Sequence, residues 1–255
     1  MKTKFLLLLL TLLPGMSLWF MGCESPEKKE PPTAWYVLVD TSGVRENAQT
    51  RQHYAEYLRT VFANLAPGDA VVVALIAEMS IAEPSFLVRH RFEPFKASTD
   101  NELYMRAEQQ KFTAGFEQTK QQLLIQAEDF ILRSERIAPK TDIITACHVA
   151  SGVFKQYPAG HKKLIVLSDM EEYDGAYNFV KDKLGEERVR RIIEQEKTGS
   201  RNIPDLAGVN VFVAGAPSKD SDRFFNIRRF WQAYFRETGA TLPDENYGAT
   251  LSIIR

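Results

Sequence analysis

Oxygen-bearing side chains follow the ends of two strongly apolar segments of the sequence. Asp40 and Ser42 come after the run WYVLV, and Asp169 follows the run KLIVL. Between these segments, Thr141 opens an apolar, helix-like stretch. Carboxylate and hydroxyl oxygens are the ligands that hard cations such as Mg²⁺, Mn²⁺ and Ca²⁺ prefer in proteins. These four residues are therefore candidate ligands of one metal ion, provided that the fold brings them together.

Four apolar segments are predicted to form the strands that place these residues. Each is a continuous run rich in β-branched residues, which is typical of parallel strands that helices cover on both faces. The segments are 35–40, 70–77, 163–169 and 209–215. In open sheets of parallel strands, ligands bind at the carboxyl ends of the strands. Asp40 and Asp169 stand at two such ends, so we expect both carboxylates at one edge of the sheet.

Helical patterns alternate with these strands. Apolar residues recur at helical spacing in segments 46–65, 141–157 and 222–239. Such alternation predicts an α/β fold with a doubly wound, mostly parallel central sheet and helices on both faces. We also expect an extra strand at 85–95, with an antiparallel position at an edge as the suggested arrangement, and a closing strand at 249–255.

Two charged insertions interrupt the alternation. The segments 100–137 and 173–201 both have helical patterns, and Gly115 is expected to divide the first into two helices. A charged helix is usually a solvated surface, and a partner-binding surface is the alternative for both segments.

At the strand ends the sequence resembles the von Willebrand factor type A (VWA) family. The segments VLVDTSG, KTDI and IVLSDME occur in the order of that family's three site loops, and the resemblance extends over residues 34–255. It implies a VWA/Rossmann-like fold with a metal-ion-dependent adhesion site (MIDAS), where an acidic side chain of a partner protein completes the coordination of the metal. Carried over residue by residue, it assigns Asp40, Ser42, Thr141 and Asp169 to the metal.

One position departs from the family's pattern. The family's first loop reads Asp-x-Ser-x-Ser, and its last serine falls on Val44, which offers no oxygen. Two interpretations stay open. In the first, water replaces the missing ligand, since Mg²⁺ tolerates several waters. In the second, the site is metal-free and Asp40 accepts hydrogen bonds from a helix N-terminus or a loop network.

The N-terminus has the pattern of an export signal. Lys2 and Lys4 precede an apolar stretch that ends at a glycine and Cys23, as in a secretory signal peptide. This junction resembles the lipobox of bacterial lipoproteins, although phenylalanine stands three residues before the cysteine, where leucine is usual. The resemblance implies that residues 1–22 are removed and that Cys23 carries lipid. An uncleaved anchor over 5–22 and soluble secretion are the alternatives.

Residues 23–33 connect this signal to the predicted domain. After the cysteine, the segment ESPEKKEPPT has no apolar residue except its prolines, so it cannot bury surface and is expected to be a flexible linker. The folded part then comprises residues 34–255. These assignments place the domain outside the cytoplasm, in the periplasm or on the surface of a bacterial cell, with the N-terminal lipid as its membrane anchor.

The composition is that of an ordinary globular protein. Of 255 residues, 44% are hydrophobic and 25% are charged, and the formal net charge is −1. Basic residues form no stripe apart from the acidic ones, so nothing supports a nucleic-acid partner. We therefore expect a binding module for another protein rather than an enzyme, with Mg²⁺, Mn²⁺ or Ca²⁺ at the site in one of the two interpretations above.

Two other functions stay open. One is a structural component of an envelope or secretion assembly that docks through residues 100–137. The other is a phosphatase-like enzyme with Asp40 as its nucleophile, as in haloacid-dehalogenase-like enzymes. Those enzymes usually carry a second aspartate two residues later, where this chain has Ser42. The sequence also offers no convincing general base and no phosphate-binding glycine loop.

Overall fold

The structure is a computed structural model that describes residues 31–42, 48–76, 85–133, 140–200, 202–216 and 221–252. One compact unit comprises Pro31–Arg255. The predicted signal peptide, Cys23 and Val44 lie outside the described residues. The first strand begins at Thr33, the last residue of the predicted linker.

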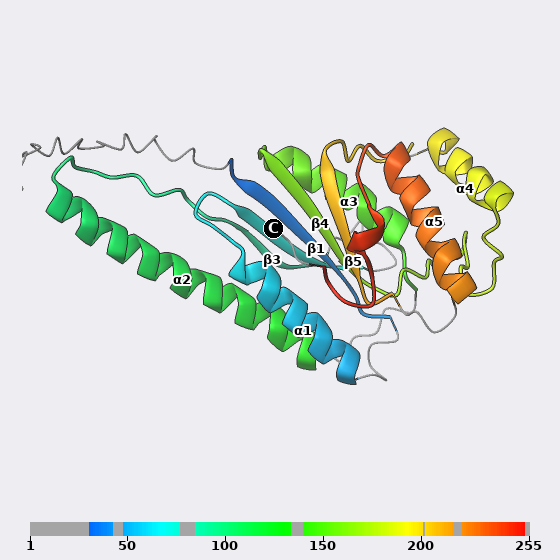
Figure 1. Cartoon of the computed structure of the whole chain (residues 1–255), viewed down its shortest axis with the longest axis horizontal. Helices are drawn as coiled ribbons and strands as arrows, with labels where there is room; N and C mark the ends of the chain where they lie inside the picture. The colour runs from blue at the N-terminus through cyan, green and yellow to red at the C-terminus, as the bar shows by residue number, and fades with distance from the viewer. Residues whose placement is uncertain are drawn as a thin grey trace, which may run out of the picture. The chain divides into compact units, whose positions relative to one another are not determined.

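A six-stranded sheet forms the centre of this unit (Figure 1). Its spatial order is β3-β2-β1-β4-β5-β6, and every neighbouring pair is parallel except β2 with β3. The strands are β1 (Thr33–Asp40), β2 (Ala70–Ile76), β3 (Phe86–Arg91), β4 (His161–Leu167), β5 (Val209–Ala214) and β6 (Tyr247–Gly248). The predicted doubly wound, mostly parallel sheet and its antiparallel edge strand are confirmed.

Helices cover both faces of the sheet (Figure 1). They are α1 (Ala48–Ala63), α2 (Glu102–Arg133), α3 (Ile143–Gln156), α4 (Glu186–Thr198) and α5 (Ser221–Glu237). Buried side chains of α1 and α2 share one hydrophobic cluster with the sheet, and those of α3, α4 and α5 share another. No helix in the described part of the chain is long and apolar enough to cross a membrane.

The central strand β1 explains why the sequence shows continuous apolar runs. Trp35, Val37 and Val39 belong to the cluster with α1 and α2. Tyr36 and Leu38 belong to the cluster on the opposite face. Because successive side chains of a strand point to opposite faces, a strand covered on both sides needs apolar residues at every position.

A buried carboxylate joins the start of β1 to the turn before β2. Asp69 is 4% exposed, and its Oδ1 accepts a hydrogen bond from the Thr33 backbone N–H at 2.7 Å. Its Oδ2 accepts from the indole N–H of Trp35 at 3.2 Å and from the Ala66 backbone N–H at 3.0 Å. Asp69 therefore fixes the end of the sheet at which β1 and β2 begin, opposite to the carboxyl ends of the parallel strands.

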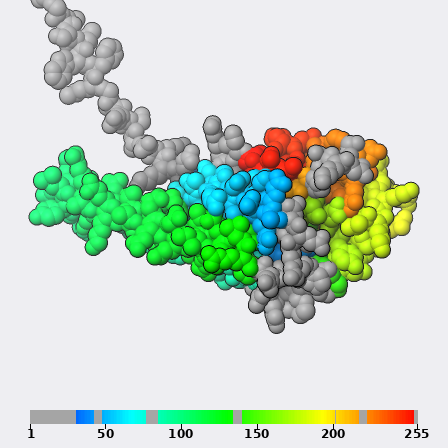
Figure 2. Space-filling model, turned by 90° about the horizontal axis from the view of Figure 1, so that it is seen from below, coloured from blue at the N-terminus to red at the C-terminus, as the bar shows by residue number. Residues whose placement is uncertain are grey.

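The first predicted insertion is a single helix. Gly115 lies inside α2 and does not divide it, contrary to the prediction. A glycine in a helix costs only about 1 kcal/mol, and the next residue, Phe116, is buried against Phe92 with ring centroids 4.8 Å apart. Nearer the start of the helix, the ring centroids of Phe112 and Phe95 lie 5.4 Å apart. Figure 2 shows α2 lying beside α1.

Two other predicted elements differ from the structure. Within 173–201, only α4 is a helix, and the residues before it form turns and bridges. The described part of the predicted last strand, 249–252, is not a strand, and the last paired segment is β6. Its partner β5 ends at Ala214, and the next residue, Gly215, has a φ of +106° and still donates its backbone N–H to the Ala249 carbonyl at 3.2 Å.

Candidate functional site

The carboxyl ends of β1 and β4 lie side by side at the centre of the sheet. The two strands are parallel, with Val39 beside Leu167. The next residues are therefore neighbours, and the hydroxyl of Ser168 donates a 2.7 Å hydrogen bond to Oδ2 of Asp40. Both side chains are buried, with exposed fractions of 0% and 2%. This contact connects the first and the third predicted site loops.

The second predicted loop joins them through Thr141. Its hydroxyl donates a 2.6 Å hydrogen bond to the hydroxyl of Ser42. The backbone N–H of Ser42 in turn donates to Oδ1 of Asp40 at 2.8 Å. Thr141 is 3% exposed, and Ser42 is half-buried. Residues from all three loops thus lie together at one edge of the sheet.

The loop that carries Asp169 is held from within the core. The backbone N–H of Met170 donates to the hydroxyl of Ser168 at 2.9 Å, and its carbonyl accepts from the indole N–H of Trp231 on α5 at 2.9 Å. Met170 has a φ of +66°, in the left-handed region that non-glycine residues seldom adopt. Asp169 itself is half-buried, and its Oδ1 accepts from the Glu171 backbone N–H at 2.9 Å.

Burial and the neighbouring charge of Asp169 both affect the ionisation of Asp40. Burial raises the pKa of Asp40 to about 6, and the nearby charge of Asp169 adds to this increase, while hydrogen bonds from Ser42 and Ser168 oppose it. Burial also raises the pKa of Asp169, and the Arg223 guanidinium opposes that change. Negative charge is thus concentrated in a poorly solvated place, where bringing a cation close lowers the free energy of the ionised carboxylates.

Two further residues near the site, Arg223 and Tyr54, were not singled out by the sequence reasoning. Arg223 on α5 forms an ion pair with Glu171, with 2.5 Å between Nη2 and Oε2. Tyr54 on α1 is buried, and the charges of Asp40 and Asp169 raise the pKa of its phenol further than burial alone does. An arginine and a tyrosine on amphipathic helices have no local sequence signal that separates them from ordinary surface or core residues.

The donor set fits a hard cation. Asp40, Ser42, Thr141 and Asp169 offer only oxygen, and no described His or Cys side chain is among them. The hydrogen bond that Thr141 donates to Ser42 leaves a lone pair available for a cation on both hydroxyl oxygens. The geometry brings the predicted residues together, and their role as metal ligands stays a prediction. Val44, the position without oxygen, lies outside the described residues.

Comparisons with known proteins return similarity of structure only. No family model matches the chain, and no curated protein matches its sequence. Similar solved structures include a von Willebrand factor type A protein from Catenulispora acidiphila, at 12% identity over 82% of this chain with a TM-score of 0.41.

Two pilus proteins are also among the similar structures. The pilus adhesin SpaC from Lactobacillus rhamnosus GG is 13% identical over 82% of this chain, with a TM-score of 0.40. Three N-terminal domains of the type V pili tip protein Mfa5 from Porphyromonas gingivalis match 56% of the chain at 11% identity, with a TM-score of 0.33. The chain spans 42%, 27% and 21% of the VWA, SpaC and Mfa5 structures, respectively.

Proposed function

We propose that this protein is a binding module that captures an acidic side chain of a partner protein at the site of Asp40, Ser42, Thr141 and Asp169. The observation that carries the proposal is the 2.6 Å contact between the hydroxyls of Thr141 and Ser42, next to two carboxylates. Together with the hydrogen bond from Ser168 to Asp40, it brings oxygen atoms from three loops to one place, as one ion requires.

The four proposed ligands would contribute two kinds of oxygen to the site. Ser42 and Thr141 would offer neutral oxygens, and the two aspartates would offer negative charge. A bound Mg²⁺, Mn²⁺ or Ca²⁺ would supply positive charge toward a carboxylate of the partner. Ser168 keeps Asp40 oriented by its hydrogen bond to Oδ2, and Trp231 holds the backbone beside Asp169 through the Met170 carbonyl.

Binding of the cation is the first test. Mg²⁺ would be titrated calorimetrically into the chelator-treated full chain and into the variants Asp40→Asn and Asp169→Asn. The proposal expects binding by the wild type and a large loss in both variants. Asp205→Asn is the matched control, because this exposed aspartate precedes β5 at the other edge of the sheet. Equal binding by all four proteins contradicts the assignment.

Capture of a partner is the second test. The immobilised chain would be exposed to cell-envelope extract in Mg²⁺ or in EDTA, with Asp169→Asn as the comparison. A protein retained only by the wild type in Mg²⁺ supports ion-bridged capture. Equal retention in Mg²⁺ and EDTA rejects the bridging mechanism, although it leaves a metal-independent binding role.

The membrane tether is a separate part of the proposal. It rests on the N-terminal sequence, in which an apolar stretch ends directly before Cys23. The full chain expressed in bacteria is expected to incorporate a labelled fatty acid and to sediment with membranes. Cys23→Ala is expected to abolish the labelling. Unchanged labelling of that variant contradicts lipidation at this residue.

A role in a larger assembly is the second candidate, and the start of α2 favours it. Leu103 and Tyr104 are 77% and 69% exposed, and this part of the helix extends past α1 (Figure 1). Deleting the helix is a poor test, because Phe116 and Ile131 belong to the core. The double variant Leu103→Ser, Tyr104→Ser is better, with Ile125→Ser on the same helix as control. If the double variant weakens assembly and Ile125→Ser does not, the result supports docking at the start of α2. If both or neither weaken it, docking at this place is contradicted.

A further inference from the structure

A second group of carboxylates lies beside the proposed site and has a different composition. Asp142, Glu172 and Asp174 each place one carboxylate oxygen within 4.8 Å of one from each of the others. Asp142 and Glu172 are buried, and Asp174 is half-buried. None of these residues belongs to the set proposed above, although Asp142 follows Thr141 directly.

Backbone contacts hold the three carboxylates in place. Thr141 and Tyr173 exchange two backbone hydrogen bonds, of 2.9 and 2.8 Å, which fix the segment before α3 against the segment that carries the glutamate. Oδ1 of Asp142 accepts from the Thr145 backbone N–H at 2.8 Å and caps α3. Oε2 of Glu172 accepts from the Ile143 backbone N–H at 2.9 Å. Two carboxylates thus share the N-terminus of one helix.

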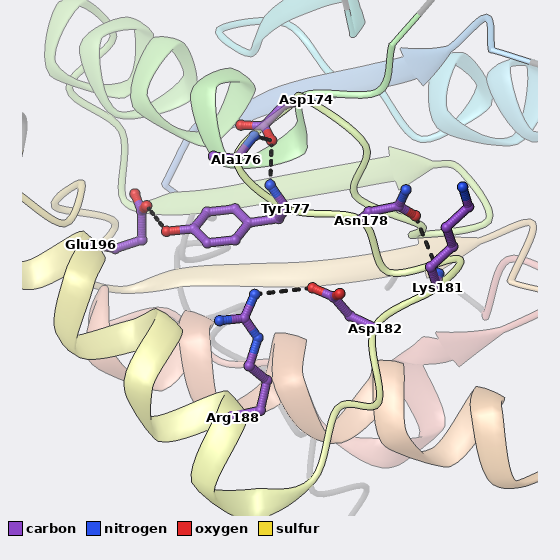
Figure 3. Close-up of polar contacts among 8 residues, drawn as sticks. All are labelled: Asp174, Ala176, Tyr177, Asn178, Lys181, Asp182, Arg188 and Glu196. Carbon is purple, nitrogen blue, oxygen red and sulfur yellow. Dashed lines mark hydrogen bonds and ion pairs between the residues drawn. The ribbon is translucent and has the colours of Figure 1, made fainter.

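Asp174 completes the group from the start of the loop before α4. Its Oδ1 accepts from the backbone N–H groups of Ala176 and Tyr177, both at 2.8 Å (Figure 3). The same loop is tied to α4 by the phenol of Tyr177, which donates to Glu196 at 2.6 Å, and by Arg188, which contacts Asp182 at 3.0 Å. The carboxylate is therefore on an ordered turn.

One oxygen of this group has no protein partner. Glu172 is 0% exposed, and within the described residues its Oε1 is buried without a hydrogen bond. An unsatisfied buried oxygen costs free energy, and more so for a charged group. The N-terminus of α3 donates a hydrogen bond to Oε2 of Glu172 but none to Oε1. Capping of the helix therefore explains the position of only one of the two carboxylate oxygens.

We infer that Asp142, Glu172 and Asp174 form a binding site for a hard divalent cation, with Ca²⁺ as the best-fitting ion. Ligands on opposite sides of Ca²⁺ are separated by roughly 4.6–5.2 Å, from contacts of about 2.3–2.6 Å, so oxygens within 4.8 Å of one another fit in one shell. The ion binds Oε1 of Glu172 and connects the start of α3 with the loop before α4. This site is independent of the one proposed for partner capture.

Lys140 provides the main alternative to an ion. Its Nζ lies 3.9 Å from where a Cβ on Gly175 would stand, next to Asp174. An ammonium group there would neutralise part of the negative charge without a metal. The two explanations differ in one observable, because only the cation site makes stability depend on Ca²⁺.

The experiment compares Ca²⁺ binding and thermal unfolding of the chelator-treated full chain and two variants. Glu172→Gln and Asp174→Asn remove one charge each, and the asparagine oxygen can still accept from the loop backbone. We expect Ca²⁺ to raise the Tm of the wild type, and each variant to bind with an affinity lower by roughly tenfold or more. In EDTA, Glu172→Gln should unfold no earlier than the wild type, because the amide keeps the size of the side chain and burial already disfavours the ionised carboxylate.

Two controls separate this site from its neighbours. Glu194→Gln removes a charge from the exposed side of α4 but none from the group or from the contacts that hold its loop, so its Ca²⁺ affinity should equal that of the wild type. Thr141→Val alters the proposed capture site and should leave the Ca²⁺-induced rise in Tm. The inference is overturned if the wild type shows no Ca²⁺-dependent change, if Glu172→Gln and Asp174→Asn bind as the wild type does, or if Thr141→Val alone abolishes binding.

Discussion

Thr141 donates a 2.6 Å hydrogen bond to Ser42, although 99 positions separate the two residues in the chain. One precedes α3 and the other follows β1, so this contact joins two loops at the carboxyl edge of the sheet. The third loop joins through Ser168 and Asp40.

Removing the Thr141 hydroxyl should weaken cation binding more than folding. In Thr141→Val, the hydrogen bond to Ser42 and one candidate ligand are lost, while the volume is nearly kept. We expect Mg²⁺ affinity to fall by about tenfold or more and the free energy of unfolding in EDTA to fall by only about 0.5–1.5 kcal/mol. Calorimetry and urea unfolding measure the two effects. Thr141→Ser keeps a hydroxyl and should retain most of the affinity, and equal affinities for all three proteins would exclude Thr141 as a ligand.

The ionisation of Asp40 should make the metal-free protein less stable as the pH rises. Its pKa is about 6 in the folded protein and 3.8 in the unfolded reference, so between these values the folded state holds a proton that the unfolded state has released. The free energy of unfolding therefore decreases from about pH 4 to about pH 6, by on the order of 2–3 kcal/mol, and does not recover above pH 6.

Urea unfolding in EDTA across this pH range measures the effect. Burial also raises the pKa of Asp169 and Glu172, so the difference between the wild type and Asp40→Asn isolates the effect of Asp40. We expect a steeper decrease for the wild type. Parallel pH curves for the two proteins would show that Asp40 does not carry the raised pKa.

Gly215 should not tolerate a side chain. Its φ is +106°, and an added Cβ would lie 2.8 Å from the Tyr54 hydroxyl oxygen and 3.0 Å from the Ser168 carbonyl oxygen. We expect Gly215→Ala to lower the free energy of unfolding by about 1–3 kcal/mol. Gly152→Ala is the matched control, because this α3 glycine has nothing within 4 Å and should gain up to about 1 kcal/mol. Equal stability of both variants would mean that β5 and β4 do not approach this closely.

Asp69 should matter for folding and not for binding. Asp69→Ala leaves the N–H groups of Thr33, Trp35 and Ala66 without their acceptor. We expect the free energy of unfolding to fall by about 2–4 kcal/mol, while the Mg²⁺ affinity of the folded fraction is unchanged. Asp69→Asn keeps one acceptor oxygen and should lose less. A variant Asp69→Ala that is as stable as the wild type would show that water replaces the carboxylate without cost.

The sequence alone determined the sheet and the edge at which the site lies. A continuous run of β-branched residues, such as the one that ends at Asp40, can be recognised from the local sequence. Its apolar side chains point to both faces of the strand, so the strand is stable only when both faces are buried. Placing Asp40 and Asp169 at the carboxyl ends of strands needed no knowledge of the tertiary structure. The same reasoning predicted an edge strand near β3, where apolar and charged residues are mixed.

The tertiary structure decided which loop residues touch. The contact of Thr141 with Ser42, the ion pair of Arg223 with Glu171 and the grouping of Asp174 with Asp142 depend on the paths of loops between elements far apart in the chain. Short-range periodicity carries no information on those paths, since they follow from how helices pack on the sheet. For the same reason, α2 remains one helix through a glycine, because packing against α1 and β3 outweighs the local preference.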